Sequence, residues 1–173
     1  MAFDPSITAF ADGSYVVSYT VGSGSDTDIV ARIVSPTGTV GPQFDIDNQT
    51  DNRNFSEVAT LTNGNFVVVD QDERSGSATD TDIDFAIFTP AGTPVIGPAP
   101  LPGAAAPTFP ESDPDVAALR DGGFVAVWTV LYPPLLAGTP TSGIRSSPTT
   151  APSSSRTLWS TSGAAETGMR RAS

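Results

Sequence analysis

A repeated acidic loop holds the residues of this sequence that are best suited to chemistry. Asp26 and Asp28 lie in "SDTD", and Asp80 and Asp82 lie in the matching "TDTD", with Asp84 two positions further on. Aspartates that alternate with Thr place hard oxygen atoms on a turn, and Ca²⁺ takes about six to eight such ligands. The pattern predicts a calcium site at these residues, and calcium is the cofactor that the chain suggests. The alternative is a solvated loop that keeps a sheet edge from pairing.

Paired carboxylates elsewhere in the chain suggest a second kind of chemistry. Asp45 and Asp47 alternate along an expected strand, so we expect them to share one face of it. Two carboxylates on one face can carry out glycoside hydrolysis. A hydrated strand face explains the same pattern, and Asp70, Asp72 and Glu73 at the end of another strand have the same two interpretations. We favour the hydrated face for both and assign no catalytic residue.

Aromatic residues recur at matching positions and have two interpretations as well. Tyr15, Tyr19, Phe66 and Trp128 all lie in strands that follow a turn. Exposed rings would stack on sugars, whereas buried rings would form the core. Their equivalent places in a repeat favour the core.

Composition excludes several classes of function. The chain has 173 residues with no Cys and no His, which removes thiol catalysis, disulfides, Cys/His zinc sites and His-based triads. Its 19 acidic residues against 8 basic ones, all Arg, give a net charge of −11. Such a chain repels phosphate backbones and anionic lipid, so we expect no nucleic-acid partner. Its apolar runs fall short of the ~20 residues of a membrane helix, so we expect no membrane insertion.

The elements that must position these residues are repeated hairpins. The turn dipeptides are Asp12-Gly13, Asn63-Gly64 and Asp121-Gly122, at spacings of 51 and 58 residues. Asp-Gly and Asn-Gly favour tight two-residue hairpin turns, in which both central positions adopt positive φ. A short strand precedes each turn, and a strand rich in Val and aromatic residues follows it. These paired strands are "SITAF" with "SYVVSYTV", "SEVATL" with "NFVVVDQ", and "DVAAL" with "GFVAVWTV".

The repeat extends beyond the hairpin. Residues 25–42 match residues 79–98, including a Pro-x-Gly turn signal at 36–38 and 90–92. A fourth strand follows as "QFDID", whereas prolines weaken the corresponding ladder in the second copy. Four antiparallel strands in each ~50 residues predict an all-β chain of propeller-blade-like units. A β-sandwich is the alternative fold.

The third copy stops after its hairpin. Residues 1–130 carry four Arg and 18 acidic residues, whereas residues 131–173 carry four Arg and one acidic residue and are rich in Ser, Thr, Pro and Ala. We therefore divide the chain into a β-repeat domain, 1–130, and a low-complexity tail, 131–173, that adds no strand. A natural linker and a shifted reading frame both explain the tail, and we favour the shifted frame. The repeat units within the first domain are about 4–53, 54–110 and an incomplete 111–130.

The repeat pattern also resembles a known class of sequence. "DGGFVAVWT" at 121–129 and "DIVARIVSPTGTVGPQF" at 28–44 resemble tandem repeats of large secreted bacterial surface proteins that accompany RTX-type, adhesin-like modules. This resemblance implies secretion or a cell-surface location, although the first residues lack the regions of a signal peptide. The calcium nonapeptide G-G-x-G-x-D of RTX repeats is absent.

These observations lead to a functional expectation. We predict a non-enzymatic structural or adhesion module that is a piece of a longer protein. Its expected partners are neighbouring copies of the repeat, or a second chain bound through open sheet edges. The alternative is a fragment of a carbohydrate-binding or glycan-processing β-propeller, with a glycan or other surface ligand as partner.

Overall fold

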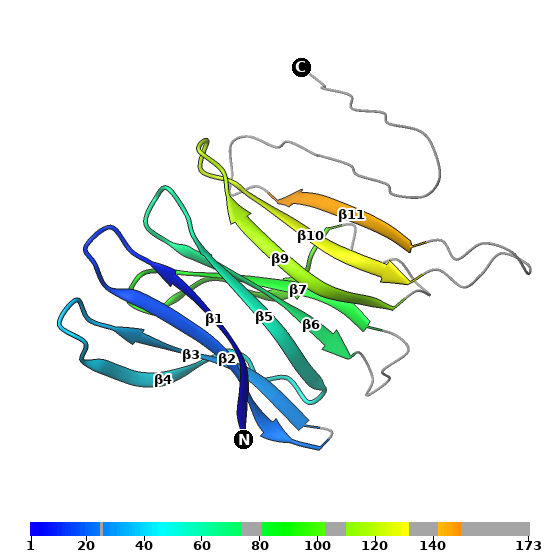
Figure 1. The fold of residues 1–173 in the computed structure, drawn as a ribbon, viewed down its shortest axis with the longest axis horizontal. Helices are drawn as coiled ribbons and strands as arrows, with labels where there is room; N and C mark the ends of the chain where they lie inside the picture. The colour runs from blue at the N-terminus through cyan, green and yellow to red at the C-terminus, as the bar shows by residue number, and fades with distance from the viewer. Residues whose placement is uncertain (25, 74–80, 103–109, 132–141, 150–173) are drawn as a thin grey trace, which may run out of the picture.

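The computed structural model is an all-β chain of three antiparallel sheets. It describes residues 1–24, 26–73, 81–102, 110–131 and 142–149. Figure 1 shows the sheets stacked one after another along the molecule. The strands are β1 (Ala2–Ala9), β2 (Tyr15–Ser23), β3 (Asp26–Val34), β4 (Val40–Asp47), β5 (Asn52–Thr60), β6 (Phe66–Glu73), β7 (Thr81–Phe88), β8 (Pro94–Pro100), β9 (Glu111–Ala118), β10 (Phe124–Leu131) and β11 (Ser142–Thr149).

Each sheet is a meander in which strands that follow one another in the chain pair side by side. The first sheet has the order β1-β2-β3-β4, the second β5-β6-β7-β8, and the third β11-β10-β9. Four-stranded antiparallel sheets that repeat along the chain are the architecture of propeller blades. The predicted fold class of propeller-like units is therefore confirmed, and the sandwich alternative is not adopted. Among the described residues, no helix is long and apolar enough to cross a membrane.

The hairpin turns share one geometry. Gly13, Gly64 and Gly122 have φ of 85°, 88° and 95°, and each donates its N–H to the carbonyl of the residue three positions earlier. A second hydrogen bond closes each loop at its base. In the first loop, the Phe10 N–H donates to the Ser14 carbonyl at 2.8 Å. The Asp or Asn before each Gly does not have positive φ. The loops therefore contain three residues, a type I turn followed by a left-handed Gly, and not the two-residue turn that Asp-Gly suggested.

The first strand of each sheet lies beside the first strand of the next sheet. β1 contacts β5, and β5 contacts β9, as Figure 1 shows. Hydrogen bonds join the first pair directly: Thr60 N–H donates to Thr8 Oγ1 at 3.2 Å, and Thr60 Oγ1 donates to the Ala9 carbonyl at 3.0 Å. The sheets therefore pack face to face and converge on one row of first strands.

Two hydrophobic clusters fill the spaces between the sheets. The cluster between the first and second sheets includes Phe10, Val16, Ile29, Phe66 and Phe88. The cluster between the second and third sheets consists of Ala59, Leu61, Val67, Val69, Ile83, Phe85, Ile87, Leu101, Phe124, Ala126, Trp128 and Val130. The second sheet therefore packs against both of its neighbours, as expected for stacked repeats.

One expectation for the C-terminal segment is wrong. β11 lies within the segment that was expected to add no strand, and it pairs with β10 from Phe124↔Thr149 to Leu131↔Ser142. A strand edge presents a row of backbone donors and acceptors, and an extended segment of almost any composition can satisfy them. Low sequence complexity was therefore a poor argument against a strand at this position. The other residues of the segment beyond Leu131 lie outside the described part of the chain.

Candidate functional site

The first strands of the three sheets, β1, β5 and β9, each contain a β-bulge at the same position. The pairing register shifts within β1, β5 and β9 near Asp4, Phe55 and Asp113. These three residues have φ of 48°, 53° and 52°, and they are the non-glycine residues of the described chain with positive φ. Such a backbone is strained for residues with a side chain, and β-bulges of this kind redirect side chains beside functional sites. The repeat thus places one redirected side chain on each inner strand.

A cavity lies where the three bulges meet. Its volume is about 350 Å³, and it is lined by Asp4, Pro5, Phe55, Ser56, Glu57, Asp113 and Pro114. Ligand pockets typically measure about 300–1,000 Å³ and combine apolar surface with a few polar groups. This cavity has both features. It is lined by three carboxyl groups, two prolines and an aromatic ring, which come from three different sheets.

Hydrogen bonds hold the Glu57 side chain in place. Ser6 Oγ donates to Glu57 Oε2 at 2.7 Å, and the same Ser6 Oγ accepts the Val58 N–H at 3.2 Å. The bond crosses from the first sheet to the second, so the docking of the two sheets fixes this carboxylate. Phe55, which also lines the cavity, has 46% of its surface exposed.

The predicted calcium ligands are divided between two sheets. Asp26 is exposed and Asp28 half-buried on β3, whereas Asp82 and Asp84 are 7% and 3% exposed on β7. Asp80 lies outside the described residues. No group of three or more acidic side chains in the described part of the chain is arranged to hold a metal ion. The calcium site stays a prediction without support from the geometry.

The threonine inside each acidic loop has a structural role that the sequence analysis missed. Thr27 Oγ1 donates to the Arg53 carbonyl at 3.0 Å and accepts the Arg53 N–H at 3.2 Å. Thr81 Oγ1 makes the same pair of bonds with Glu111, at 2.6 and 3.0 Å. Each threonine therefore ties the third strand of one sheet to the first strand of the next. The repeated "DTD" is explained by this bridge without any ion.

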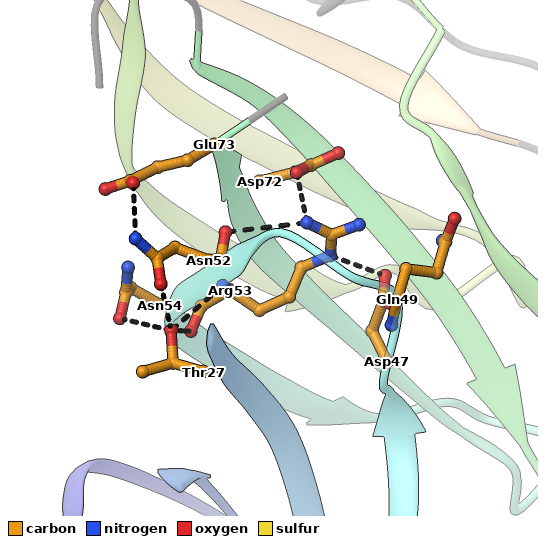
Figure 2. A network of polar contacts seen from close by, with 8 residues as sticks. All are labelled: Thr27, Asp47, Gln49, Asn52, Arg53, Asn54, Asp72 and Glu73. Atoms are coloured by element: carbon orange, nitrogen blue, oxygen red, sulfur yellow. Dashed lines mark hydrogen bonds and ion pairs between the residues drawn. The ribbon is translucent and has the colours of Figure 1, made fainter. Parts of the chain in front are cut away.

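A buried ion-pair network lies beside the first bridge. Arg53 is 1% exposed; its Nε lies 3.3 Å from Asp47 Oδ2, and its Nη1 contacts Asp72 Oδ1. Figure 2 shows the guanidinium between the two carboxylates, with Asn52 reaching Glu73 on the other side. This network joins β4, β5 and β6, and it satisfies charges that would otherwise be costly to bury.

The expectation that Asp45 and Asp47 share a face is wrong. The register between β3 and β4 shifts at this point, with Val30 opposite Asp45 and Ile29 opposite Asp47. A bulge inserts one residue and ends the alternation of side chains. Asp45 is consequently exposed, whereas Asp47 is 1% exposed and paired with Arg53.

Asp70 is a buried acid with a strongly perturbed pKa. It is 1% exposed and lies opposite Asp84 in the pairing of β6 with β7. Burial, followed by the charges of Asp47 and Asp84, raises the pKa of Asp70 well above its ordinary value. Asp70 and Asp72 are thus not the hydrated strand face that was predicted, because the first sheet covers them.

The aromatic residues divide between the two interpretations. Phe66 and Trp128 are 0% and 2% exposed, which places them in the core as favoured. Tyr15 and Tyr19 are half-buried, and the Tyr19 hydroxyl accepts Arg32 Nε–H at 3.0 Å. None of the four lines the cavity among the described residues; Phe55, which the sequence analysis did not select, does.

Comparison with solved structures identifies proteins of the same fold. A thermostable family-43 glycoside hydrolase matches with a TM-score of 0.58 and 14% identity, over 86% of this chain and 48% of that one. A family-117 glycoside hydrolase, Zg3597 from the marine bacterium Zobellia galactanivorans, matches with a TM-score of 0.58 and 13% identity, over 87% and 53%. An α-L-arabinofuranosidase from Lactobacillus brevis matches with a TM-score of 0.52 and 15% identity, over 84% and 49%.

These matches correct two predictions. The resemblance to RTX-associated adhesin repeats is wrong, because the structures that share this fold are glycoside hydrolases. The prediction of a non-enzymatic structural or adhesion module is contradicted by the same finding. The chain spans about half the length of these structures, and identities of 13–15% show the fold alone. No protein-family model matches the chain, and no curated protein does.

Proposed function

We propose that this chain is part of a glycan-processing β-propeller and that the cavity between β1, β5 and β9 binds the sugar. The observation that carries the proposal is the placement of Asp4, Glu57 and Asp113 from three successive sheets around one cavity. The shared fold of three glycoside hydrolases supports the proposal. It also agrees with the alternative prediction from the sequence, a fragment of a glycan-processing β-propeller.

The chemistry follows from the carboxyl groups. Glycoside hydrolysis uses two of them: one donates a proton to the leaving oxygen, and the other activates water or attacks the sugar. The cavity offers three, which is enough for this pair and for one group that orients the sugar. Phe55 offers a flat apolar face to the C–H side of a sugar ring, and Ser6 orients Glu57.

The experiment measures binding and turnover separately on the 173-residue chain. The probes are arabinan, xylan and 4-nitrophenyl α-L-arabinofuranoside, chosen because one structure of the same fold is an α-L-arabinofuranosidase. We expect binding by calorimetry and release of 4-nitrophenol. Removing a group that acts as acid or base, by Glu57→Gln or Asp113→Asn, should lower turnover by about 10²–10⁴-fold while binding persists.

A matched control uses a carboxyl outside the cavity. Asp12→Asn alters an exposed turn residue and should leave binding and turnover unchanged. Phe55→Ala should weaken binding at least about tenfold, equivalent to about 1.4 kcal/mol. Binding of glycan with no detectable turnover would contradict hydrolysis. Absence of both binding and turnover with every probe would contradict the proposal as a whole.

A further inference from the structure

The polar side chains that line the cavity offer hydrogen-bond acceptors rather than donors. Asp4, Glu57 and Asp113 line it, and an ionised carboxylate only accepts hydrogen bonds. Ser56 is the lining residue with a hydroxyl group, and it donates its hydrogen to Ser18 Oγ at 3.0 Å. A ligand that fits these side chains must therefore supply the donors. A hydroxyl group supplies one, whereas an ammonium group supplies three.

The cavity also carries negative charge with no arginine among its described lining residues. Arg53 is buried and paired with Asp47 and Asp72, and Arg120 lies exposed in the hairpin turn after β9. Even when one of the three carboxyl groups carries the proton that glycoside hydrolysis needs, two negative charges remain. A sugar that bears a carboxylate or a sulfate is repelled by such a cavity, whereas a cation is attracted to it.

An exposed aromatic ring shares the cavity with these carboxylates. Phe55 lines the cavity and is 46% exposed. The face of an aromatic ring attracts an organic cation that lies within about 6 Å of its centre. No three acidic side chains of the described residues are arranged to hold a metal ion. The cavity, with a volume of about 350 Å³, therefore suits an organic cation better than a metal ion.

We propose that the glycan bound in this cavity carries a free amino group, whose ammonium lies between the carboxylate of Asp4 and the ring of Phe55. The inference rests on the proposed function and names its class of sugar. Glu57 and Asp113 are the groups proposed there as acid or base, which leaves Asp4 to bind the amine. Asp4 and Phe55 lie in the bulges of neighbouring strands, β1 and β5, and both line the cavity.

The test compares three oligosaccharides on the 173-residue chain by calorimetry, at a pH where the sugar amine is protonated. Oligosaccharides of chitosan, chitin and cellulose share one backbone and differ at one ring carbon, which carries an amine, an acetamide or a hydroxyl group. We expect the amine to bind about tenfold or more tightly than the hydroxyl, and added salt to reduce this preference.

Variants locate the amine. Asp4→Asn should remove most of the preference because the amide has no charge, and Phe55→Leu should reduce it because the side chain stays apolar but loses its ring. Asp115→Asn is the matched control, since Asp115 is an exposed carboxyl on β9 outside the cavity lining, and it should leave the preference unchanged. Circular dichroism confirms that each variant is folded. A preference that persists in Asp4→Asn and Phe55→Leu would overturn the proposal.

The remaining outcomes separate this inference from the proposed function. A chain that binds arabinan, xylan or the cellulose oligosaccharide as tightly as the chitosan oligosaccharide would overturn the inference and leave the proposed function standing. Choline, an ammonium compound without a sugar ring, tests the source of the cation. If choline binds as tightly as the chitosan oligosaccharide, the cavity recognises a small cation and not an amino sugar. Absence of binding with every sugar would overturn both proposals.

Discussion

The two interfaces between sheets have the same backbone arrangement but different chemistry. The interface between the first and second sheets is apolar at the turn end, where Phe66 stacks on Phe88 with ring centroids 5.5 Å apart. Its other end contains Asp47, Arg53, Asp70 and Asp72, all at most 4% exposed. The interface between the second and third sheets is lined instead by the apolar cluster that includes Ile83, Trp128 and Val130.

Equivalent positions show where the difference arises. Asp70 and Asp72 of the second sheet correspond to Trp128 and Val130 of the third, and both pairs are buried. A threonine bridge, from Thr27 or from Thr81, is present at both interfaces. The repeat therefore keeps the bridge and the apolar turn end, whereas the position of Asp70 and Asp72 also accepts the apolar side chains of Trp128 and Val130. Glu111, which is 0% exposed, places a buried carboxyl group at the second interface as well.

Removing the cation of the first interface should have the largest effect. Arg53→Met removes the positive charge between Asp47 and Asp72, and breaking a buried ion pair in this way costs about 3–5 kcal/mol. Urea unfolding at pH 7 and fixed protein concentration measures the loss. Arg32→Met, at a half-buried position on the face of the first sheet that points away from the second sheet, is the matched control and should cost no more than about 1 kcal/mol. Equal losses for the two variants would show that the network is not a special feature of this interface.

The pH dependence of stability should report on Asp70. Its pKa is raised in the folded chain, so the folded state keeps this proton at a pH where the unfolded chain has lost it. The contribution of Asp70 to stability is therefore complete below the pKa of the unfolded chain and is lost as the pH rises toward the folded pKa. The slope is at most about 1.4 kcal/mol per pH unit for one proton.

Asp70→Asn should remove that slope, because an amide does not ionise. We expect the variant to gain stability relative to the wild type as the pH rises, measured by thermal unfolding across the acid-to-neutral range. Direct titration of the Asp70 carboxyl by NMR provides an independent check. Parallel stability profiles for the two proteins would mean that Asp70 ionises as readily in the folded chain as in the unfolded one.

The smallest expected loss of stability comes from removing one buried methylene group from each interface. Ile83→Val between the second and third sheets, and Ile29→Val between the first and second, each remove a single buried methylene from a side chain that is 0% exposed. Each should cost about 0.5–1.5 kcal/mol. The cost should not vary with pH in either variant. A pH-dependent loss for Ile29→Val alone would show that the charged network extends into the apolar end of its interface.

Local chemistry made much of the fold predictable from sequence. The Asp-Gly and Asn-Gly turns, the strands on either side of them and the repeat spacing are all properties of short segments, and the structure contains each of them. The loop length was predicted less well, since a three-residue loop and a two-residue loop both favour Gly after Asp. The roles of the acidic residues were predicted poorly because they depend on the neighbouring sheet.

The cavity residues were visible in the alignment but carried no chemical signal there. Asp4, Phe55 and Asp113 occupy the same position relative to the three turns, yet one of them is an aromatic residue and two precede proline. Only the bulges in β1, β5 and β9 show that the position is strained and faces a common cavity. When the three repeats are aligned on their turns, Asp and Phe replace one another at this position. A search of that alignment for such replacements could have selected it.

The sequence by itself determined the repeat, the strands and the turns, because hydrogen bonding and backbone preference act over a few residues. Only the tertiary structure decided that Asp47 is buried with Arg53 while Asp45 is exposed, because one bulge reverses the face that a side chain occupies. It likewise decided that the threonine, and not the aspartates, explains the repeated acidic loop. The physical reason is the same in both cases: burial and charge pairing depend on what packs against a strand, and the packing sheet comes from a distant part of the chain.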